Sequence, residues 1–244
     1  MPGLVIPPLV MSHQSAVATL IASYGINLVE SDPKGNARPL KDTELSILLD
    51  TLQKLGPEWY GKFKTKPLNF WIDKNPGGGG YNNGWIRIGE PGDDPSILYR
   101  ILLHEGTHAS NEYRGWIYEN EWCQRPGLDW RKTGNDWNHP RIQNNPGMAV
   151  KGEWDSLPTD TRDVSIHPAE DLAETVRYYV HSVKAERSYL WPLDQNKPGV
   201  FLWDTSPARH VFIRDVFLKL APDHAWYKML HPSLERDAKA RLGI

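Results

Sequence analysis

Cysteine is almost absent from this chain, which has one, Cys123, among 244 residues. A single thiol excludes an internal disulfide framework and leaves the redox compartment open. An excess of one charge is lacking too, because 28 Lys and Arg stand against 30 Asp and Glu, a formal net charge of −2. Such a balance excludes the one-sided basic surface of a nucleic-acid-binding protein, so nucleic acid is not expected as a partner.

Long apolar runs are absent as well. No uninterrupted apolar stretch reaches the length that crosses a bilayer, so no membrane span is expected. Residues 1–8 are apolar but interrupted by prolines, and no basic residue precedes Lys34, so the N-terminus does not resemble a signal peptide. The chain is therefore predicted to be cytoplasmic or exported by a leaderless route, and excision from a longer precursor stays open.

What the chain does contain is the pentapeptide His104-Glu105-Gly106-Thr107-His108, which reads H-E-x-x-H. On a helix, histidines at this spacing project from one face, so both imidazoles can reach one metal ion. The glutamate between them can accept a proton from a water molecule at that ion. The motif therefore indicates a metal site, provided that the segment is helical.

The flanking residues favour a helix. The segment Asp93-Asp94-Pro95 supplies cap residues and a proline suited to a first turn. Ile97 and Ile101 continue the face of His104 and His108 at helical steps. A buried helix whose histidines bond to backbone carbonyls is the alternative, but it leaves the neighbouring glutamate unexplained. We therefore expect a zinc site.

The rest of the chain predicts an α+β protein. Helices are expected over 14–24, over about 41–55, from about 168 towards 190, after Pro207 and over 232–242. Strands are expected over 68–73 and 84–89. The glycine-rich residues 75–83 between the strands predict a hairpin connection rather than a phosphate-binding loop, because no Gly-Lys-Ser/Thr follows. The edge of the strand over 84–89 could accept an extended peptide.

No repeat or linker divides the chain. Residues 1–244 are therefore predicted to form a single domain with two lobes, about 1–115 with the histidine helix and about 116–244. Residues 115–164 are rich in Trp, Asn, Pro and Gly and are long for a structureless loop, so a binding role or local structure is expected there. Most of the 11 tryptophans are expected in the core.

A catalytic zinc site usually has three protein ligands and one open position. A third histidine six residues after His108 is excluded, because Arg114 stands there. Glu170 and Glu174 lie one helical turn apart, where one carboxylate can bind the ion and the other can hold a ligand imidazole. The alternative is a solvated acidic first turn, which the helix dipole favours.

A strand, an H-E-x-x-H helix and a later helix carrying E-x-x-A-E together resemble the glutamate-type zincin metallopeptidases, in particular the group of anthrax lethal factor and the Pro-Pro endopeptidases. The resemblance spans about residues 68–185. It implies an α+β, zincin-like fold, with a small twisted sheet beside the active-site helix and a mainly helical C-terminal lobe. It also implies that His104, His108 and Glu170 bind Zn²⁺, that Glu105 is the general base and that Glu174 supports a ligand imidazole.

One residue departs from that group. A tyrosine often stands seven residues before the glutamate ligand, where it stabilises the oxyanion, and here the position is Asp163. Other residues near the motifs in sequence are candidates for this role: Tyr178, Tyr179, His167, Tyr113 and Arg177. Position alone does not choose among them, and Tyr179 is equally suited to the core.

The activity that follows is that of a zinc-dependent endopeptidase acting on a peptide or protein substrate. A zinc-bearing binding module without turnover is the first alternative, and Glu105 argues against it because a structural site needs no base. A carbohydrate-active protein with tryptophan platforms is the second, but glycosidases use a carboxylate pair that no spacing here identifies. No G-x-S-x-G motif supports a serine hydrolase.

Overall fold

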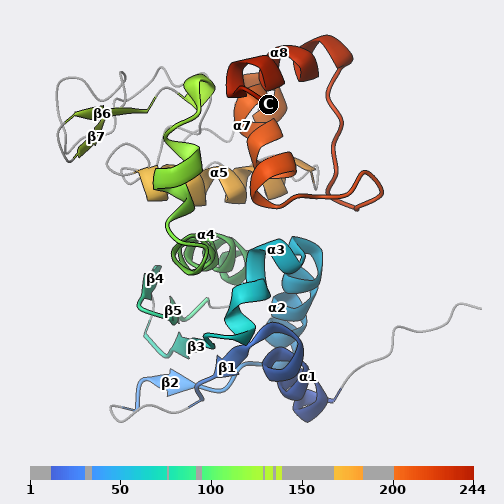
Figure 1. The fold of residues 1–244 in the computed structure, drawn as a ribbon. Coiled ribbons are helices and arrows are strands. Elements are labelled where there is room, and N and C mark those ends of the chain that lie inside the picture. The colour runs from blue at the N-terminus through green and yellow to red at the C-terminus, as the bar shows by residue number, and fades with distance from the viewer. Residues whose placement is uncertain are drawn as a thin grey trace, which may run out of the picture.

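A mixed β-sheet forms the base of the N-terminal part of the chain in this computed structural model, which describes residues 12–30, 35–75, 77–91, 95–128, 130–133, 136–138, 168–183 and 201–244 (Figure 1). The strand order is β1-β3-β5-β4, and β2 pairs with the end of β3. The strands are β1 (Ile26–Leu28), β2 (Ala37–Arg38), β3 (Leu68–Asp73), β4 (Gly79–Asn82) and β5 (Trp85–Gly89). Strands β1, β3 and β5 run parallel, whereas β2 and β4 are antiparallel to their neighbours.

The connection between β3 and β5 differs from the predicted hairpin. Because β3 and β5 are parallel, they cannot be joined by a tight turn. The glycine-rich stretch instead contains β4, which forms the hairpin with β5. Its two-residue turn is Asn83-Gly84, with φ of 44° and 83°, and Asn-Gly is the pair that such a turn favours.

Helix α2 (Asp42–Leu55) packs its predicted apolar stripe into the core, where Leu45, Leu48, Leu52 and Leu55 are buried. It ends at Gly56, whose φ of 77° is accessible to glycine at little cost. Three short helical segments flank it, α1 (His13–Thr19), η1 (Leu20–Tyr24) and α3 (Pro57–Tyr60). The helices predicted over 14–24 and 41–55 are thus confirmed.

Helix α4 (Pro95–Tyr113) carries the histidine motif and lies between two layers. It contacts α2, β4 and β5 on one side and α5 (Pro168–Val183) on the other. Figure 1 views α4 nearly end-on between the sheet below and α5 above. Leu98, Leu102 and Leu103 are fully buried, so the apolar surface of α4 anchors it; the predicted cap residues Asp93 and Asp94 lie outside the described residues.

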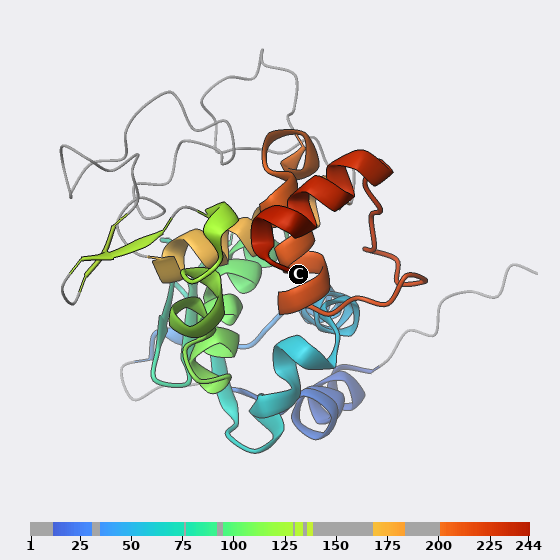
Figure 2. The same cartoon turned by 45° about the horizontal axis from the view of Figure 1, so that its top comes forward.

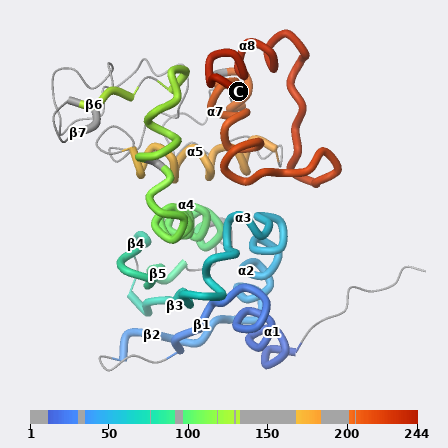
Figure 3. The backbone as a smooth tube through the Cα atoms, in the orientation of Figure 1, coloured from blue at the N-terminus to red at the C-terminus, as the bar shows by residue number. Residues whose placement is uncertain are grey.

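The C-terminal part is helical. Beyond α5, it contains α6 (Leu202–Thr205), α7 (Pro207–Val211), the π-helical segment η6 (Phe212–Phe217) and α8 (Pro232–Leu242). In Figure 1 these segments, drawn in orange and red, lie above the level of α4, whereas α1 lies below it; Figure 2 shows the same elements in a turned view, and Figure 3 traces the path as a tube. The helix predicted over 232–242 is confirmed, and the continuation of α5 towards Leu190 lies outside the described residues.

The segment of residues 115–164 (the insert) has local structure where it is described. It contains η3 (Tyr118–Trp122), η4 (Pro126–Leu128) and the two-stranded sheet of β6 (Arg131–Thr133) with β7 (Asp136–Asn138). The α+β class, with a small sheet beside the histidine helix and a mainly helical C-terminal part, is thus confirmed. Within the described residues, no helix combines the length and apolar character needed to cross a membrane.

Candidate metal centre

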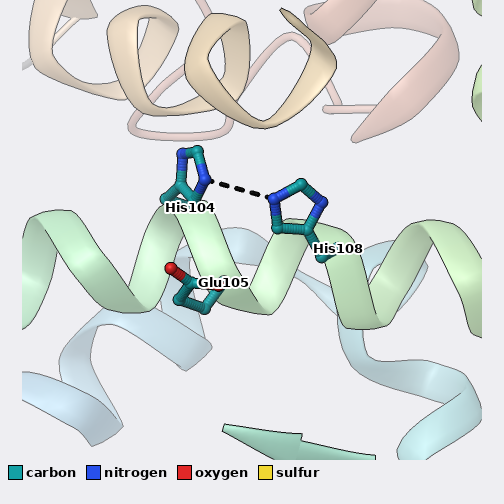
Figure 4. A group of neighbouring side chains, drawn as sticks. All are labelled: His104, Glu105 and His108. Atoms are coloured by element: carbon teal, nitrogen blue, oxygen red, sulfur yellow. Dashed lines mark hydrogen bonds between the residues drawn. The ribbon is translucent and has the colours of Figure 1, made fainter. Parts of the chain in front are cut away.

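His104 and His108 lie one turn apart on α4 and project towards α5, as Figure 4 shows. Their Nε2 atoms are 3.1 Å apart, and the two rings meet edge to face. Glu105 leaves the helix in a different direction (Figure 4). The side-chain spacing expected from the motif is therefore present, with both imidazole nitrogens facing one point.

Glu170 completes this arrangement from the first turn of α5. Its Oε2 atom lies 3.1 Å from Nε2 of His104 and 3.2 Å from Nε2 of His108. Three potential ligand atoms thus form a nearly equilateral triangle. Neighbouring ligands in tetrahedral zinc coordination are about 3.3 Å apart when the bonds are about 2.0–2.1 Å, so this donor set fits zinc.

Glu105 also offers a carboxylate near the histidines, because atoms of His104, Glu105 and His108 lie within 4.8 Å of one another. This group could hold a metal by itself. Glu170 is better placed than Glu105 to act as a third ligand, since one of its oxygen atoms approaches both Nε2 atoms at about the separation expected for shared coordination. That leaves the Glu105 carboxylate available for proton transfer.

Glu174 lies behind His104, on the side away from the triangle. Its Oε1 atom is 2.6 Å from Nδ1 of His104, although the contact is not aligned as a regular hydrogen bond. The other carboxylate oxygen of Glu174 accepts a hydrogen bond from Arg177. A carboxylate at Nδ1 favours a proton on that nitrogen and leaves the Nε2 lone pair for a metal, while Arg177 is occupied by this contact.

The charges of the site are set by burial and by mutual pairing. Burial opposes ionisation of Glu170, but hydrogen bonds with His104 and His108 outweigh it and hold the pKa of Glu170 well below its usual range. Burial also disfavours a charged His104, yet its contacts with Glu170 and Glu174 raise its pKa to about 10. A metal must therefore displace a proton from His104 when it binds.

Glu105 occupies a restricted position beside β4. Burial raises its pKa, against the opposing effect of the two histidines, which suits a group that must take up a proton near neutral pH. A Cβ added at Gly79 would lie 2.9 Å from Oε1 of Glu105 and 2.1 Å from Cγ2 of Ile101. Only glycine fits there, so the backbone of β4 runs directly against the candidate base.

A cleft of about 700 Å³ opens over these residues. Its lining combines the histidine motif and Glu170 with β4 and with Asn111, Glu112 and Trp116 at the end of α4. Glu112 accepts hydrogen bonds from Lys66 Nζ at 3.0 Å and from the Tyr81 hydroxyl at 2.6 Å. The sequence did not single out Glu112 as a residue of the site, although Glu112 stands at the next helical step after His108.

The tyrosines proposed as oxyanion stabilisers are not brought to the cleft. The Tyr179 hydroxyl donates to the carbonyl oxygen of Trp226 at 2.7 Å in the core, and Tyr178 is buried on α5. Neither lines the cleft, and His167 lies outside the described residues. Among the residues that the structure describes, Tyr81 on β4 is the tyrosine that lines the cleft.

Tyr113, another candidate for that role, points elsewhere. Its ring packs edge to face against Phe63, and its hydroxyl lies 2.7 Å from where a Cβ of Gly84 would stand. Tyr113 is thus part of the packing between α4 and the β4–β5 turn. It is absent from the residues that line the cleft.

A buried polar cluster holds the start of α5 in place. The Asp171 carboxylate is fully buried and accepts hydrogen bonds from Arg209 at 2.6 Å, from Trp130 Nε1 at 2.8 Å and from Trp122 Nε1 at 3.1 Å. The adjacent residue is Glu170. The insert and α7 therefore converge on the segment that presents Glu170 to the histidines.

No family model matches the chain, and no curated protein sequence matches it. Among solved structures it is similar to a crystal structure from Bacteroides caccae that is provisionally named a zinc-binding metallo-peptidase, with 14% sequence identity over 95% of this chain and 94% of the other and a TM-score of 0.42. A likeness at this TM-score assigns no activity to the chain.

Proposed function

We propose that this protein is a zinc-dependent endopeptidase of the glutamate-ligand type, with His104, His108 and Glu170 as metal ligands. The observation that carries the proposal is the triangle of ligand atoms, with edges of 3.1, 3.1 and 3.2 Å, beside the buried Glu105 in an open cleft. A purely structural zinc site is usually closed by four protein ligands. Three ligands and a neighbouring carboxylate favour catalysis.

The residues of the site have different roles in peptide hydrolysis. A zinc ion, when bound, acidifies a water molecule and polarises the carbonyl group of the scissile bond. Glu105 accepts the proton from the attacking water and passes it to the leaving amine. Glu174 orients His104 through Nδ1, and the resulting ring position keeps Nε2 directed at the ion.

Strand β4 supports a peptide as the substrate. The predicted docking edge was that of β5, but β5 lies between β3 and β4, so β4 ends the sheet. Strand β4 also lines the cleft and passes against Glu105. An extended peptide can add to such an edge through main-chain hydrogen bonds, which places one of its peptide bonds beside the base.

The cleft also supports the division into two lobes. Its lining includes β4 and α4 from about residues 1–115, and Trp116, Ala169 and Glu170 from the following part of the chain. With lobes of about residues 1–115 and 116–244, the two histidines would belong to one lobe and Glu170 to the other. Metal binding would hold these lobes together at the cleft.

Cleavage profiling of a proteome-derived peptide library tests the proposed activity, with wild-type protein and Glu105→Gln compared at equal zinc content. Cuts made by wild type and lost in Glu105→Gln, while both bind one zinc ion, are the expected result. Equal cutting by the two proteins would contradict the role of Glu105. Zinc binding without cutting by wild type would instead favour the binding module.

A further inference from the structure

Trp116 is an exposed aromatic residue on the wall of the cleft. Its side chain lies just beyond the end of α4, and 48% of its surface is exposed. We infer that the Trp116 indole is a specificity-determining subsite for an aromatic or long aliphatic side chain of the peptide, an inference that rests on the proposed function. Tryptophan offers a large apolar face at small entropic cost, which is why it dominates many binding sites.

The backbone holds this indole in an unfavourable conformation. Trp116 has φ of 61° and follows Gly115, with φ of 81°, although a bulky side chain rarely adopts a left-handed conformation. Hydrogen bonds fix the turn on both sides, from Trp116 N to Asn111 O at 2.9 Å, from Asn120 Nδ2 to Gly115 O at 2.8 Å and from Glu119 N to Trp116 O at 3.0 Å. Strain of this kind persists where the surroundings enforce it, and it concentrates at functional sites.

The polar groups that line the same cleft bear on which side chain fits. Both oxygen atoms of Glu112 are engaged, one by Lys66 and one by Tyr81. The Tyr81 hydroxyl also accepts a hydrogen bond from the Gly84 backbone at 3.1 Å. A charged substrate side chain would therefore find the Glu112 carboxylate of the cleft already paired. The exposed part of the Trp116 indole offers apolar area to the substrate side chain, so it selects for an apolar one.

Glycine is the informative substitution at this position. Trp116→Gly removes the indole and suits the left-handed backbone, so the fold is expected to be kept. Trp85→Ala is the matched control, because Trp85 is also 48% exposed but lies on β5 and does not line the cleft. The two changes remove equally exposed indoles, of which one belongs to the proposed subsite.

The test is selection of a random peptide library on zinc-loaded Glu105→Gln protein, which needs no turnover, with cleavage profiling of the wild-type background in parallel. We expect enrichment of Phe, Tyr, Trp, Leu or Met at one peptide position, reduced about 10-fold by Trp116→Gly and unchanged by Trp85→Ala. Cleavage profiles should show the same preference at one position near the scissile bond.

Each other outcome has a definite meaning. Unchanged enrichment in Trp116→Gly, an equal loss in Trp85→Ala, selection of Lys or Arg, or absence of any enrichment would overturn the subsite. Enrichment that depends on Trp116 without cleavage by wild type would uphold the subsite and overturn the proposed peptidase. The two proposals therefore fail separately.

Discussion

Glu170 and Glu174 are carboxylates one turn apart on α5, yet they should affect zinc to different degrees. Glu170 approaches both Nε2 atoms, whereas Glu174 touches Nδ1 of His104 alone. We expect Glu174→Gln to weaken zinc binding about 10–100-fold, as is usual for partners of ligand histidines, and Glu170→Ala to weaken it further. Competition with a chromophoric chelator at fixed pH measures both constants.

Glu112→Gln is the control for this comparison. Glu112 lies on the same helix as the histidines and lines the same cleft, but its hydrogen bonds go to Lys66 and Tyr81. Its substitution should leave zinc affinity unchanged. If Glu112→Gln and Glu174→Gln weakened zinc binding equally, loss of negative charge would explain the effect and the specific contact with His104 would not.

Some residues of the site could be predicted and others could not, for a physical reason. His104, Glu105 and His108 are related by helical spacing, which is local and visible in the sequence. Glu170 and Glu174 are also related by helical spacing, but only the resemblance implies which of them is the ligand, because the packing of α5 on α4 is not encoded in either segment alone. Trp116 escaped prediction because its place depends on a turn that leaves α4 with positive φ.

At the scale of elements, the packing of α3 against α4 depends on Gly106. A Cβ there would lie 2.3 Å from Cη2 and 2.4 Å from Cζ2 of the buried Trp59 ring. Alanine normally stabilises a helix interior relative to glycine by about 0.5–1 kcal/mol, but a rigid indole cannot yield, and overpacking costs about 1–3 kcal/mol. Gly106→Ala should therefore destabilise the protein, as urea unfolding measures.

Two further variants sharpen this prediction. Gly61→Ala is the control, since a Cβ there meets nothing within 4 Å and the residue has φ of −56°, so stability should be unchanged or rise by about 0.4–1 kcal/mol. In a double-mutant cycle, Trp59→Leu should relieve the Gly106→Ala penalty. Additive effects of Gly106→Ala and Trp59→Leu would show that the clash is not the cause.

Helix α5 depends on a buried ion pair between Asp171 and Arg209. Both side chains are almost completely buried, so Asp171→Ala leaves an unpaired buried guanidinium, which costs about 3–5 kcal/mol. Chemical denaturation should show this loss. Asp50→Ala, which breaks the exposed pair with Lys54 on α2, should cost about 0.5 kcal/mol or less. Similar losses in both variants would contradict the assignment of Asp171 as the anchor.

The elements themselves were predictable to the extent that their patterns are local. The apolar stripe of α2 and the alternation of buried and partly buried residues in β3 identify one as a helix and the other as a strand, each from its own segment. Strand β4 could not be recognised in the same way, because Gly79 and Gly80 carry no side chain that alternates. Only its turn, Asn83-Gly84, signalled the hairpin. The parallel pairing of β3 with β5 is long-range and has no local signature.

At the scale of the whole molecule, the stability of the fold should fall in acid. Burial lowers the pKa of His210 on α7 to about 4, although its hydrogen bond to the Lys228 carbonyl opposes the shift. Burial disfavours the charged form of Glu235 on α8, but Arg214 and Lys239 hold its pKa at about 2. Both pKa values lie below their ordinary ones, so the unfolded chain binds protons first as the pH falls.

The direction of the pH effect and its pH range follow from the lowered pKa of His210. The contribution of His210 to the free energy of unfolding is fully present above its ordinary pKa of 6.5 and is lost as the pH falls to about 4. This loss amounts to about 3 kcal/mol. The unfolding free energy of wild type should therefore drop between pH 7 and pH 4, and that of His210→Gln should drop by about 3 kcal/mol less. Urea unfolding across this range measures the difference, in which the titrations of all other groups cancel. Parallel curves for the two proteins would show that His210 is not buried as a neutral side chain between α7 and the segment that carries Lys228.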